Sequence, residues 1–322
     1  MELTHPDVIA FIKACSAEGS DSFIITNKMP GPDDVRRFAS FLDGRTLVLT
    51  GRRTPERTCE NVIYADVGEA ADEAFAERLK KDRVTEILLP FYECADVLEY
   101  GYRTSYSFLG DLRASSDLRF HITGVSPNET ADDGVYSLLG SKKFIVAGQK
   151  IESVFTGVKA SDDEEKCGIV LSQCVKSPFM KTIVLFSTRR QADEFSLKLY
   201  KRGVKCAVAH GGTAKEQAKL SLESFLSGET SILLSTKYLI PSCGVIKADR
   251  LIYCGLPYGV SHAKRCICLS KSGRMDVVFC EDDIALAQSL TASYAEALGI
   301  DDPGFTEKRK SMLDEFLNAL QY

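Results

Sequence analysis

Residues that could hold nucleotide phosphates are scarce in this sequence. A phosphate-binding loop needs glycines for close backbone approach, a lysine for charge and a hydroxyl that holds Mg²⁺, in the pattern G-x-x-x-x-G-K-[ST]. This pattern does not occur in the 322 residues. The fragment Thr26 to Asp34, which follows the first apolar run, supplies one glycine, Gly31, and one cation, Lys28. Its two prolines lack an N–H and its two carboxylates repel phosphate, so Lys28 and Gly31 form at most a vestige of a nucleotide site.

The 11 cysteines indicate reduced, buried thiols and not a disulfide framework, because their number is odd and most lie beside apolar, strand-like residues. Cys254, Cys266, Cys268 and Cys280 contain one C-x-C pair with 11 residues on either side. Zinc knuckles need two C-x₂-C pairs, so no metal site is predicted. No cysteine and histidine form a recognisable catalytic pair.

Short apolar runs alternate with amphipathic stretches of helical period, which is typical of βαβ units and a parallel sheet. One series extends from Ser22–Thr26 to Arg119–Thr123, and a second begins at Thr182–Ser187. Between them, the acidic stretch Lys159–Lys166 is predicted to be a surface loop. The fold class predicted from this alternation is α/β.

The length and the break in the alternation predict two domains. The first occupies residues 1–150, a linker and domain crossover occupy 151–180, and the second occupies 181–322. A helix with Thr306 as its cap is predicted near the end of the chain, with its apolar face packed on the second domain.

Five fragments of the second half carry a family resemblance in their order and spacing. They are Ile183–Arg190, Val208–Gly211, Phe225–Gly228, Ile232–Thr236 and Leu251–Pro257. These fragments resemble the F-x-x-T-R, H-G-D, F-x-x-G, S-T-D and D-L-P motifs in the carboxy-terminal RecA-like domain of DEAD-box RNA helicases. The first half is similar to the other domain of that family more faintly, at Leu47–Pro55, Glu86–Tyr102 and His121–Pro127. The resemblance implies two tandem RecA-like domains, each a mainly parallel sheet flanked by helices.

The resemblance also implies that the residues that handle ATP have been replaced. At the D-E-A-D position Tyr92 and Ala95 stand for the two aspartates, while Glu93 remains. Pro241-Ser-Cys-Gly244 stands for R-G-L-D, and Arg265–Ser272 lacks both phosphate-facing arginines of H-R-I-G-R-S-G-R. Without these groups neither the metal nor the transferred phosphate is held. Lys28, Gly31 and Glu93 are therefore expected to be a vestigial, inactive nucleotide site, with no cofactor and no catalytic residue.

Contacts to RNA are a separate expectation, because the family grips the sugar-phosphate backbone with amides, hydroxyls and a few arginines. By position, Arg53, Thr188, Arg189, Gly211 and Thr236 match residues that make such contacts. The resemblance therefore implies weak binding of single-stranded or structured RNA through these five residues.

The composition restricts the remaining choices. Forty Lys and Arg against 45 Asp and Glu give a net charge of −5, so any nucleic-acid contact needs a local basic surface. No apolar run approaches the roughly 20 residues that span a bilayer. The first residues lack the pattern of a secretory signal, and we expect a cytoplasmic or nuclear protein with no membrane partner.

These inferences predict a non-catalytic, DEAD-box helicase-like protein that acts as a binding or scaffolding subunit of an RNA–protein assembly. Its expected partners are protein subunits of that assembly, with RNA bound weakly. Two alternatives stay open: a divergent ATP-dependent RNA helicase or RNA-dependent ATPase, and a module that binds a nucleotide by stacking its base on Phe91 or Tyr92.

Overall fold

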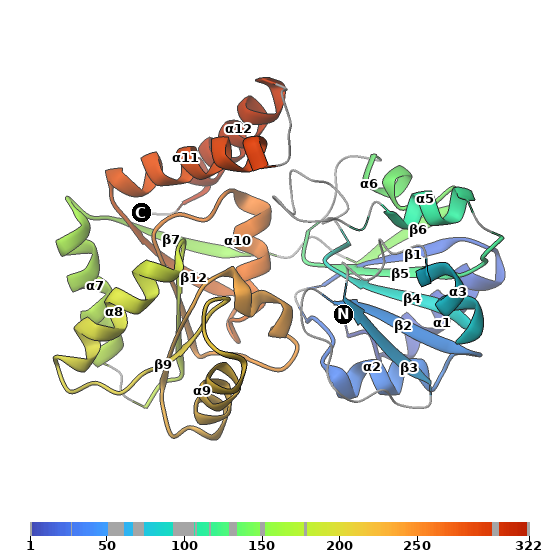
Figure 1. Cartoon of the computed structure of the whole chain (residues 1–322), viewed down its shortest axis with the longest axis horizontal. Coiled ribbons are helices and arrows are strands. Elements are labelled where there is room, and N and C mark those ends of the chain that lie inside the picture. The colour runs from blue at the N-terminus through green and yellow to red at the C-terminus, as the bar shows by residue number, and fades with distance from the viewer. Residues whose placement is uncertain are drawn as a thin grey trace. The chain divides into compact units, whose positions relative to one another are not determined.

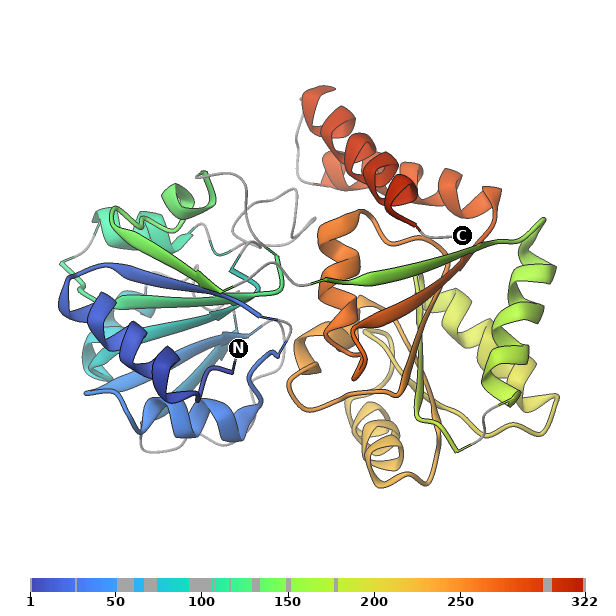
Figure 2. The same ribbon diagram turned by 180° about the vertical axis from the view of Figure 1, so that it is seen from behind.

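A computed structural model of the chain describes residues 2–26, 28–50, 61–66, 74–92, 106, 108–115, 117–128, 134–148, 152–176, 179–297 and 303–320. The chain divides into two compact units, Met1–Ile151 and Glu152–Tyr322. Each unit contains one six-stranded sheet, and every strand pairing in both sheets is parallel. Helices cover both faces of each sheet (Figures 1 and 2).

The sheet of the first unit has the strand order β3-β2-β4-β5-β1-β6. Its strands are β1 (Asp21–Ile25), β2 (Arg45–Thr50), β3 (Val62–Asp66), β4 (Val84–Pro90), β5 (His121–Ser126) and β6 (Phe144–Gly148). Its helices are α1 (Pro6–Ala17), α2 (Pro32–Ala39), α3 (Ala74–Lys81), α5 (Phe108–Ser115) and α6 (Gly134–Leu138). Helices α1 and α2 lie on one face, and α3, α5 and α6 lie on the other (Figures 1 and 2).

The sheet of the second unit has the order β7-β12-β11-β8-β10-β9. Its strands are β7 (Val154–Lys159), β8 (Thr182–Phe186), β9 (Ala207–Ala209), β10 (Ile232–Ser235), β11 (Arg250–Cys254) and β12 (Arg274–Phe279). Its helices are α7 (Asp163–Lys176), α8 (Arg189–Tyr200), α9 (Lys215–Ser227), α10 (Val260–Ile267), α11 (Glu281–Ala297) and α12 (Pro303–Ala319), with a 3-10 helix, η3 (Lys237–Ser242).

The continuous apolar runs of the sequence form the central strands, because helices cover both faces of a parallel sheet and its central strands are buried on both sides. All five residues of β8 and all four of β10 are buried. One face packs under α7 and α8, where Phe186 meets Phe195 with ring centroids 5.3 Å apart. Helices α9, α10 and α12 lie toward the other face (Figures 1 and 2), where Phe155 of β7 packs against Phe316 of α12 at 5.4 Å.

Two local predictions need correction. The stretch Lys159–Lys166 is not only a loop, since it contains the end of β7 and the first residues of α7. These two elements occupy much of the segment 151–180, and β7 pairs with β12 within the second sheet. The last helix packs on α10 and α11 as predicted, but it begins at Pro303, so Thr306 lies inside the helix and is not its cap.

The nine described cysteines are free thiols, and seven of them are buried, which confirms the prediction that most of these sulfurs are buried. Cys167 and Cys206 are only partly buried. Among the described helices, none combines the length and the apolar character that crossing a bilayer requires.

Candidate functional site

The carboxyl edge of the second sheet gathers four of the predicted RNA-contact residues. Strands β8, β10 and β9 are neighbours and run parallel, so the loops after them open at the same edge. Thr188 and Arg189 follow β8, Thr236 follows β10, and Gly211 comes two residues after β9. Ligands of open parallel sheets bind at this edge. Arg53 lies outside the described residues.

Both threonine hydroxyls at this edge cap a helix. The Thr188 hydroxyl accepts the Gln191 N–H at 3.3 Å, and the Gln191 side-chain oxygen accepts the Thr188 N–H at 3.0 Å, which forms a capping box at the start of α8. Thr236 is buried, and its hydroxyl accepts the Tyr238 N–H at the start of η3. These hydroxyls are therefore already used within the fold, which limits what they can offer to a phosphate.

Arg189 is an exposed cation of this edge, as is Arg190 next to it, and the Arg189 guanidinium lies against the turn after β9. A Cβ atom on Gly211 would lie 3.2 Å from Arg189 Nη2, and one on Gly212 would lie 3.3 Å from Arg189 Cδ. A Cβ at either position would press on the Arg189 side chain, so Gly211 and Gly212 let the guanidinium sit close to the backbone. Thr188, Arg189 and Gly211 thus form one contiguous surface.

A histidine network that sequence reasoning missed holds the same turn. His210 is buried; its Nε2 lies 2.9 Å from an Asp193 carboxylate oxygen, and its Nδ1 accepts the Gly212 N–H at 3.1 Å. The Gly212 N–H leaves Nδ1 without a proton, so Nε2 donates to Asp193. The two residues are 17 positions apart, and no local sequence pattern predicts their pairing.

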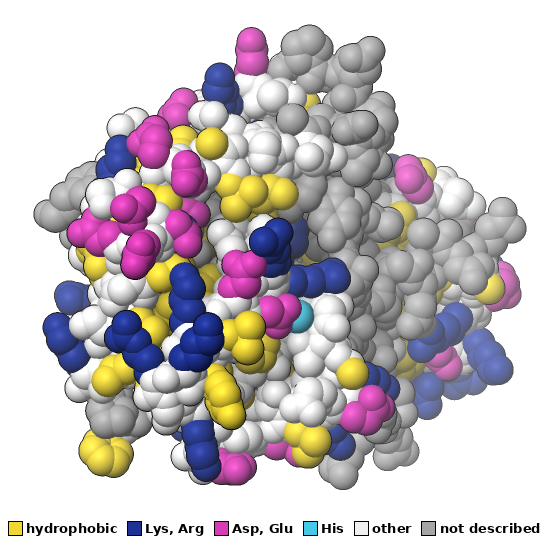
Figure 3. Space-filling model, turned by 60° about the vertical axis from the view of Figure 1, so that its left-hand side comes forward, with side chains coloured by type: hydrophobic (Ala, Val, Ile, Leu, Met, Phe, Trp, Pro, Cys, Tyr) yellow, Lys and Arg dark blue, Asp and Glu magenta, His cyan; other side chains and the backbone are white. Residues whose placement is uncertain are grey.

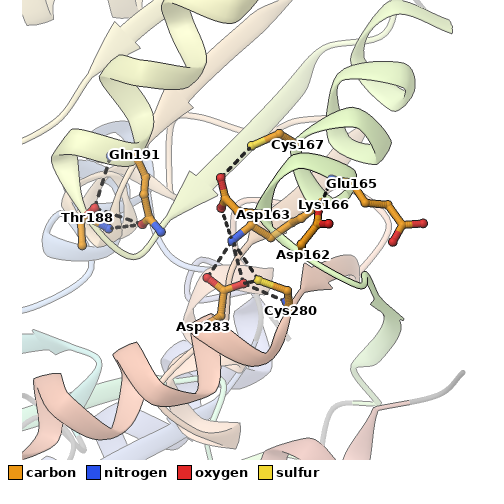
Figure 4. Close-up of polar contacts among 9 residues, drawn as sticks. All are labelled: Asp162, Asp163, Glu165, Lys166, Cys167, Thr188, Gln191, Cys280 and Asp283. Carbon is orange, nitrogen blue, oxygen red and sulfur yellow. Dashed lines mark hydrogen bonds and ion pairs between the residues drawn. The ribbon is translucent and has the colours of Figure 1, made fainter.

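The sheet edge continues past β11 to a buried ion pair between α7 and α11 (Figure 4). Lys166 Nζ lies 2.8 and 2.7 Å from the two carboxylate oxygens of Asp283 and 2.9 Å from Asp163. Only 2% of the Lys166 side chain and 3% of the Asp283 side chain are exposed. Burial favours a lower pKa for Lys166, but its hydrogen bonds with Asp283 and Asp163 outweigh burial and raise that pKa. Lys166 therefore stays charged.

Asp283 also reaches the backbone around the candidate site. Its carboxylate accepts the Cys280 N–H at 2.9 Å, where β12 leads into α11. Gly255, after β11, has φ +118°, and a Cβ there would lie 3.4 Å from Asp283 and 3.1 Å from the Ser187 hydroxyl. Ser187 directly precedes Thr188, so the ion pair supports the loop that carries Thr188 and Arg189.

In the first unit, the residues proposed as a vestigial nucleotide site are engaged with their neighbours. Lys28 Nζ lies 2.6 Å from a carboxylate oxygen of Glu2. The Gly31 N–H donates to the Asp34 carboxylate at 3.0 Å, at the start of α2. Glu93 lies outside the described residues. Among the described residues of the first unit, the contacts of Lys28 and Gly31 are thus with the carboxylates of Glu2 and Asp34.

Phe91 and Tyr92, the alternative base-stacking residues, are both buried. The Tyr92 ring packs against Phe23 at 4.8 Å and against Tyr136 at 6.1 Å between centroids. Their ring faces therefore belong to the core of the first unit. Among the described residues, no group of three or more His, Cys, Asp or Glu could hold a metal ion.

A second acid–base pair, Glu86 with His121, lies inside the first sheet. The two residues are register partners on β4 and β5, and Glu86 Oε2 lies 2.7 Å from His121 Nδ1. Their side chains are only 5% and 8% exposed, so a substrate has no access to them. Burial raises the pKa of Glu86, whereas for His121 the hydrogen bond and charge of Glu86 outweigh burial and raise the pKa above 6.5.

The Glu86–His121 pair makes stability depend on pH. A pKa that is higher in the folded than in the unfolded state means that the folded protein favours the protonated group. The stabilising contribution is then present at low pH and is lost as the pH rises, for Glu86 as for His121. As the pH is raised from 5 to 8, we expect the urea midpoint of the first unit to decrease more steeply in the wild type than in Glu86→Gln, because this variant lacks the coupled carboxylate. Far-UV circular dichroism at each pH measures the two slopes, and equal slopes would contradict this assignment.

Comparison with known proteins bears on both units. Residues 165–275 match the family described as the helicase conserved C-terminal domain. The structure of S. cerevisiae Dbp5 bound to RNA and ADP BeF3 matches with TM-score 0.55 and 10% identity, over 94% of this chain and 82% of that one. The chain has a helicase-like fold. Both six-stranded parallel sheets match RecA-like folds of helicases, which confirms the predicted fold class.

A second solved structure gives the same fold. Mycobacterium smegmatis helicase Lhr, bound to ssDNA and AMP-PNP, matches with TM-score 0.59 and 13% identity over 87% of this chain. The match covers 42% of the Lhr chain, so this protein spans less than half the length of that helicase. The family match falls within the second unit and includes Thr188, Arg189, Gly211 and Thr236.

Proposed function

We propose that this chain is a non-catalytic, DEAD-box helicase-like protein, a binding or scaffolding subunit of an RNA–protein assembly in the cytoplasm or nucleus. The hydrogen bond from the Gly31 N–H to the Asp34 carboxylate carries this proposal. Amides at the start of a helix that follows a strand are the groups that bind nucleotide phosphates. Here the chain's own carboxylate takes such an amide, and its negative charge repels an incoming phosphate.

The surrounding residues do not fit a nucleotide with its Mg²⁺. The one cation of the loop, Lys28, is paired with Glu2, and Asp33 adds a further carboxylate to the first turn of α2. Tyr92, at the position where the resemblance implies a metal-binding aspartate, is fully buried. These residues therefore support no catalytic step through ATP.

The carboxyl edge of the second sheet supports weak RNA binding within this role. Arg189 is exposed beside Gly211 and can contact a backbone phosphate, which positions RNA without reading its sequence. The hydroxyls of Thr188 and Thr236 are used as helix caps, so they add little. In this role the chain binds the assembly mainly through its protein subunits. Its affinity for these subunits and for RNA does not depend on binding or hydrolysing a nucleotide.

A thermal-shift titration tests the non-catalytic part of the proposal. The full chain is melted with ATP, ADP or a non-hydrolysable ATP analogue plus Mg²⁺, each with and without single-stranded RNA. A ligand at about 100 times its Kd adds about 2.7 kcal/mol to the native state, which raises Tm by several degrees. We expect no nucleotide-dependent shift. A saturable shift that Lys28→Ala abolishes would instead support the divergent ATPase.

Sedimentation of cell extract tests the scaffold part independently. The chain is expected to travel with a particle much larger than its own 35.4 kDa and to stay with protein subunits after ribonuclease treatment. Migration as a free monomer, before and after treatment, would contradict a role as a subunit. Arg189→Ala should leave this association intact, because the RNA contribution is small.

A further inference from the structure

The amino edge of the second sheet carries a local basic surface, although the whole chain is acidic. No Asp or Glu occurs from Lys166 to Ala192 or from Phe195 to Lys215. The loops and helix ends at this edge present exposed cations and exposed aromatic rings together. We call this set the basic rim, and its members are Lys176, Phe179, Tyr200, Lys201, Arg202 and Lys205.

Two aromatic side chains of the basic rim are far more exposed than large apolar residues usually are. Phe179, between α7 and β8, is 98% exposed, and Tyr200, the last residue of α8, is 80% exposed. A phenylalanine side chain that stays in water adds no burial energy to the stability of the fold. Rings that stand out among cations are, however, the arrangement that binds single-stranded nucleic acid, because the bases stack on the rings while cations neutralise the phosphates.

The two parts of the basic rim lie side by side. Helices α7 and α8 run over the same face of the sheet, and Val204 and Cys206, after α8, pack against the cluster that contains Leu171 and Cys174 of α7. Lysine and arginine side chains gather beside exposed apolar groups at the lower left of Figure 3, whereas carboxylates gather at the upper left. The helix starts that hold these carboxylates, in α7 and α11, lie at the opposite edge of the sheet.

The carboxylates nearest in sequence are already engaged away from the rim. Asp193 bonds to His210 at 2.9 Å and Glu194 pairs with Arg190 at 2.7 Å, both in the first half of α8. Tyr200 comes six positions after Glu194 in α8, a rise of about 9 Å. Two further carboxylates lie at this edge, before the neighbouring strands: Asp249 pairs with Lys271 at 2.8 Å, and Glu229 is exposed before β10. The four cations of the basic rim outnumber these two carboxylates.

We propose that the basic rim binds single-stranded RNA without sequence preference, by phosphate contacts to Lys201, Arg202 and Lys205 and base stacking on Phe179 and Tyr200. This surface is distinct from the Thr188–Arg189 edge, because the 12 residues of α8 separate the two by about 18 Å. The inference does not depend on whether the first unit binds a nucleotide. It gives the RNA–protein assembly a second RNA contact.

Fluorescence anisotropy with a fluorescein-labelled oligouridine of 20 nucleotides tests the proposal on the full chain. Phe179→Ala/Tyr200→Ala is expected to weaken binding at least about tenfold, since stacking on each ring contributes substantially. Lys201→Glu/Lys205→Glu should lower the slope of log K against log[salt] by about 1.4 for two lost phosphate contacts. The matched controls, Leu220→Ala on exposed α9 surface and Lys308→Glu/Lys310→Glu on α12, should each stay within about twofold of wild type.

Further arms separate the possible outcomes. All variants must melt within a degree or two of wild type, which is expected for solvent-exposed positions. An unchanged affinity of the aromatic variant, or equal losses in both charge variants, would overturn the proposal. Equal competition by a poly-glutamate peptide would also overturn it and point to an acidic protein segment. Arg189→Ala tests the carboxyl edge. If this variant alone lost affinity for RNA, the proposed function would remain intact and the basic rim would be rejected.

Discussion

Replacing Asp283 by asparagine is expected to lower the free energy of unfolding of the second unit by about 3–5 kcal/mol, because the buried Lys166 ammonium then lacks its principal counter-charge. The two side chains are almost fully buried, and both Asp283 oxygens lie within 2.8 Å of Lys166 Nζ. Asparagine keeps the shape but presents one acceptor and no charge. The exposed Asp163 is left to compensate alone.

Hydrogen exchange of peptides from β12 and α11 measures this loss within the second unit. Three to five kcal/mol corresponds to exchange faster by about two to nearly four orders of magnitude. Glu281→Gln is the matched control, because its ion pair with Lys159 is exposed on both sides and is expected to contribute less than about 1 kcal/mol. Equal exchange in the two variants would show that the buried pair adds no net stability.

The same variant links stability to the candidate site. Asp283 lies against Gly255, which lies against Ser187, the residue before Thr188. Faster exchange in Asp283→Asn is therefore expected to extend to the loop with Thr188 and Arg189. Because the pKa of Lys166 is raised, the contribution of its charge is present at neutral pH and is lost as the pH rises into the strongly alkaline range.

The sheets could be predicted from the sequence because strands buried on both faces are continuous apolar runs. The expected strand Thr182–Ser187 differs from β8 by one residue. The Thr188 capping box was also readable, since threonine followed three residues later by glutamine is a local signature. These features depend on neighbours in sequence, and local pattern is sufficient for them.

The buried ion pair could not be predicted in the same way. Lys166 belongs to an acidic stretch that has the composition of a solvated loop, and its partner Asp283 is 117 positions away. Only the pairing of β7 with β12 brings the starts of α7 and α11 together. The error at Thr306 is also physical: threonine is a good cap, but Pro303 is already favourable in the first turn of a helix, so α12 starts earlier.

The candidate site shows the same division. The order and spacing of the motifs predicted which residues follow β8, β9 and β10, and the parallel pairing then places them at one edge. The use of the Thr236 hydroxyl as a cap and the His210–Asp193 bond depend on side-chain geometry that spacing does not contain. The sequence therefore located the edge, and the structure decides which of its groups remain available.

Asp21 is the position in the first unit where a single substitution is expected to have a comparable effect. Its buried carboxylate accepts Arg113 Nη1 at 2.6 Å and Nη2 at 2.9 Å, the Ile122 N–H at 2.8 Å and the Ser141 hydroxyl at 2.6 Å. These donors come from α5, from β5 and from the turn before β6, so one carboxylate joins three segments to β1.

Asp21→Asn is expected to destabilise the first unit by about 3–5 kcal/mol, because its amide group would face donors and Arg113 would lose its counter-charge. Hydrogen exchange of β1 and β5 peptides measures the effect. Asp33→Asn makes the same chemical change at a 92% exposed side chain paired with Arg36, where we expect less than about 1 kcal/mol. If both variants exchange alike, the four hydrogen bonds of Asp21 make no net contribution to the stability of the sheet.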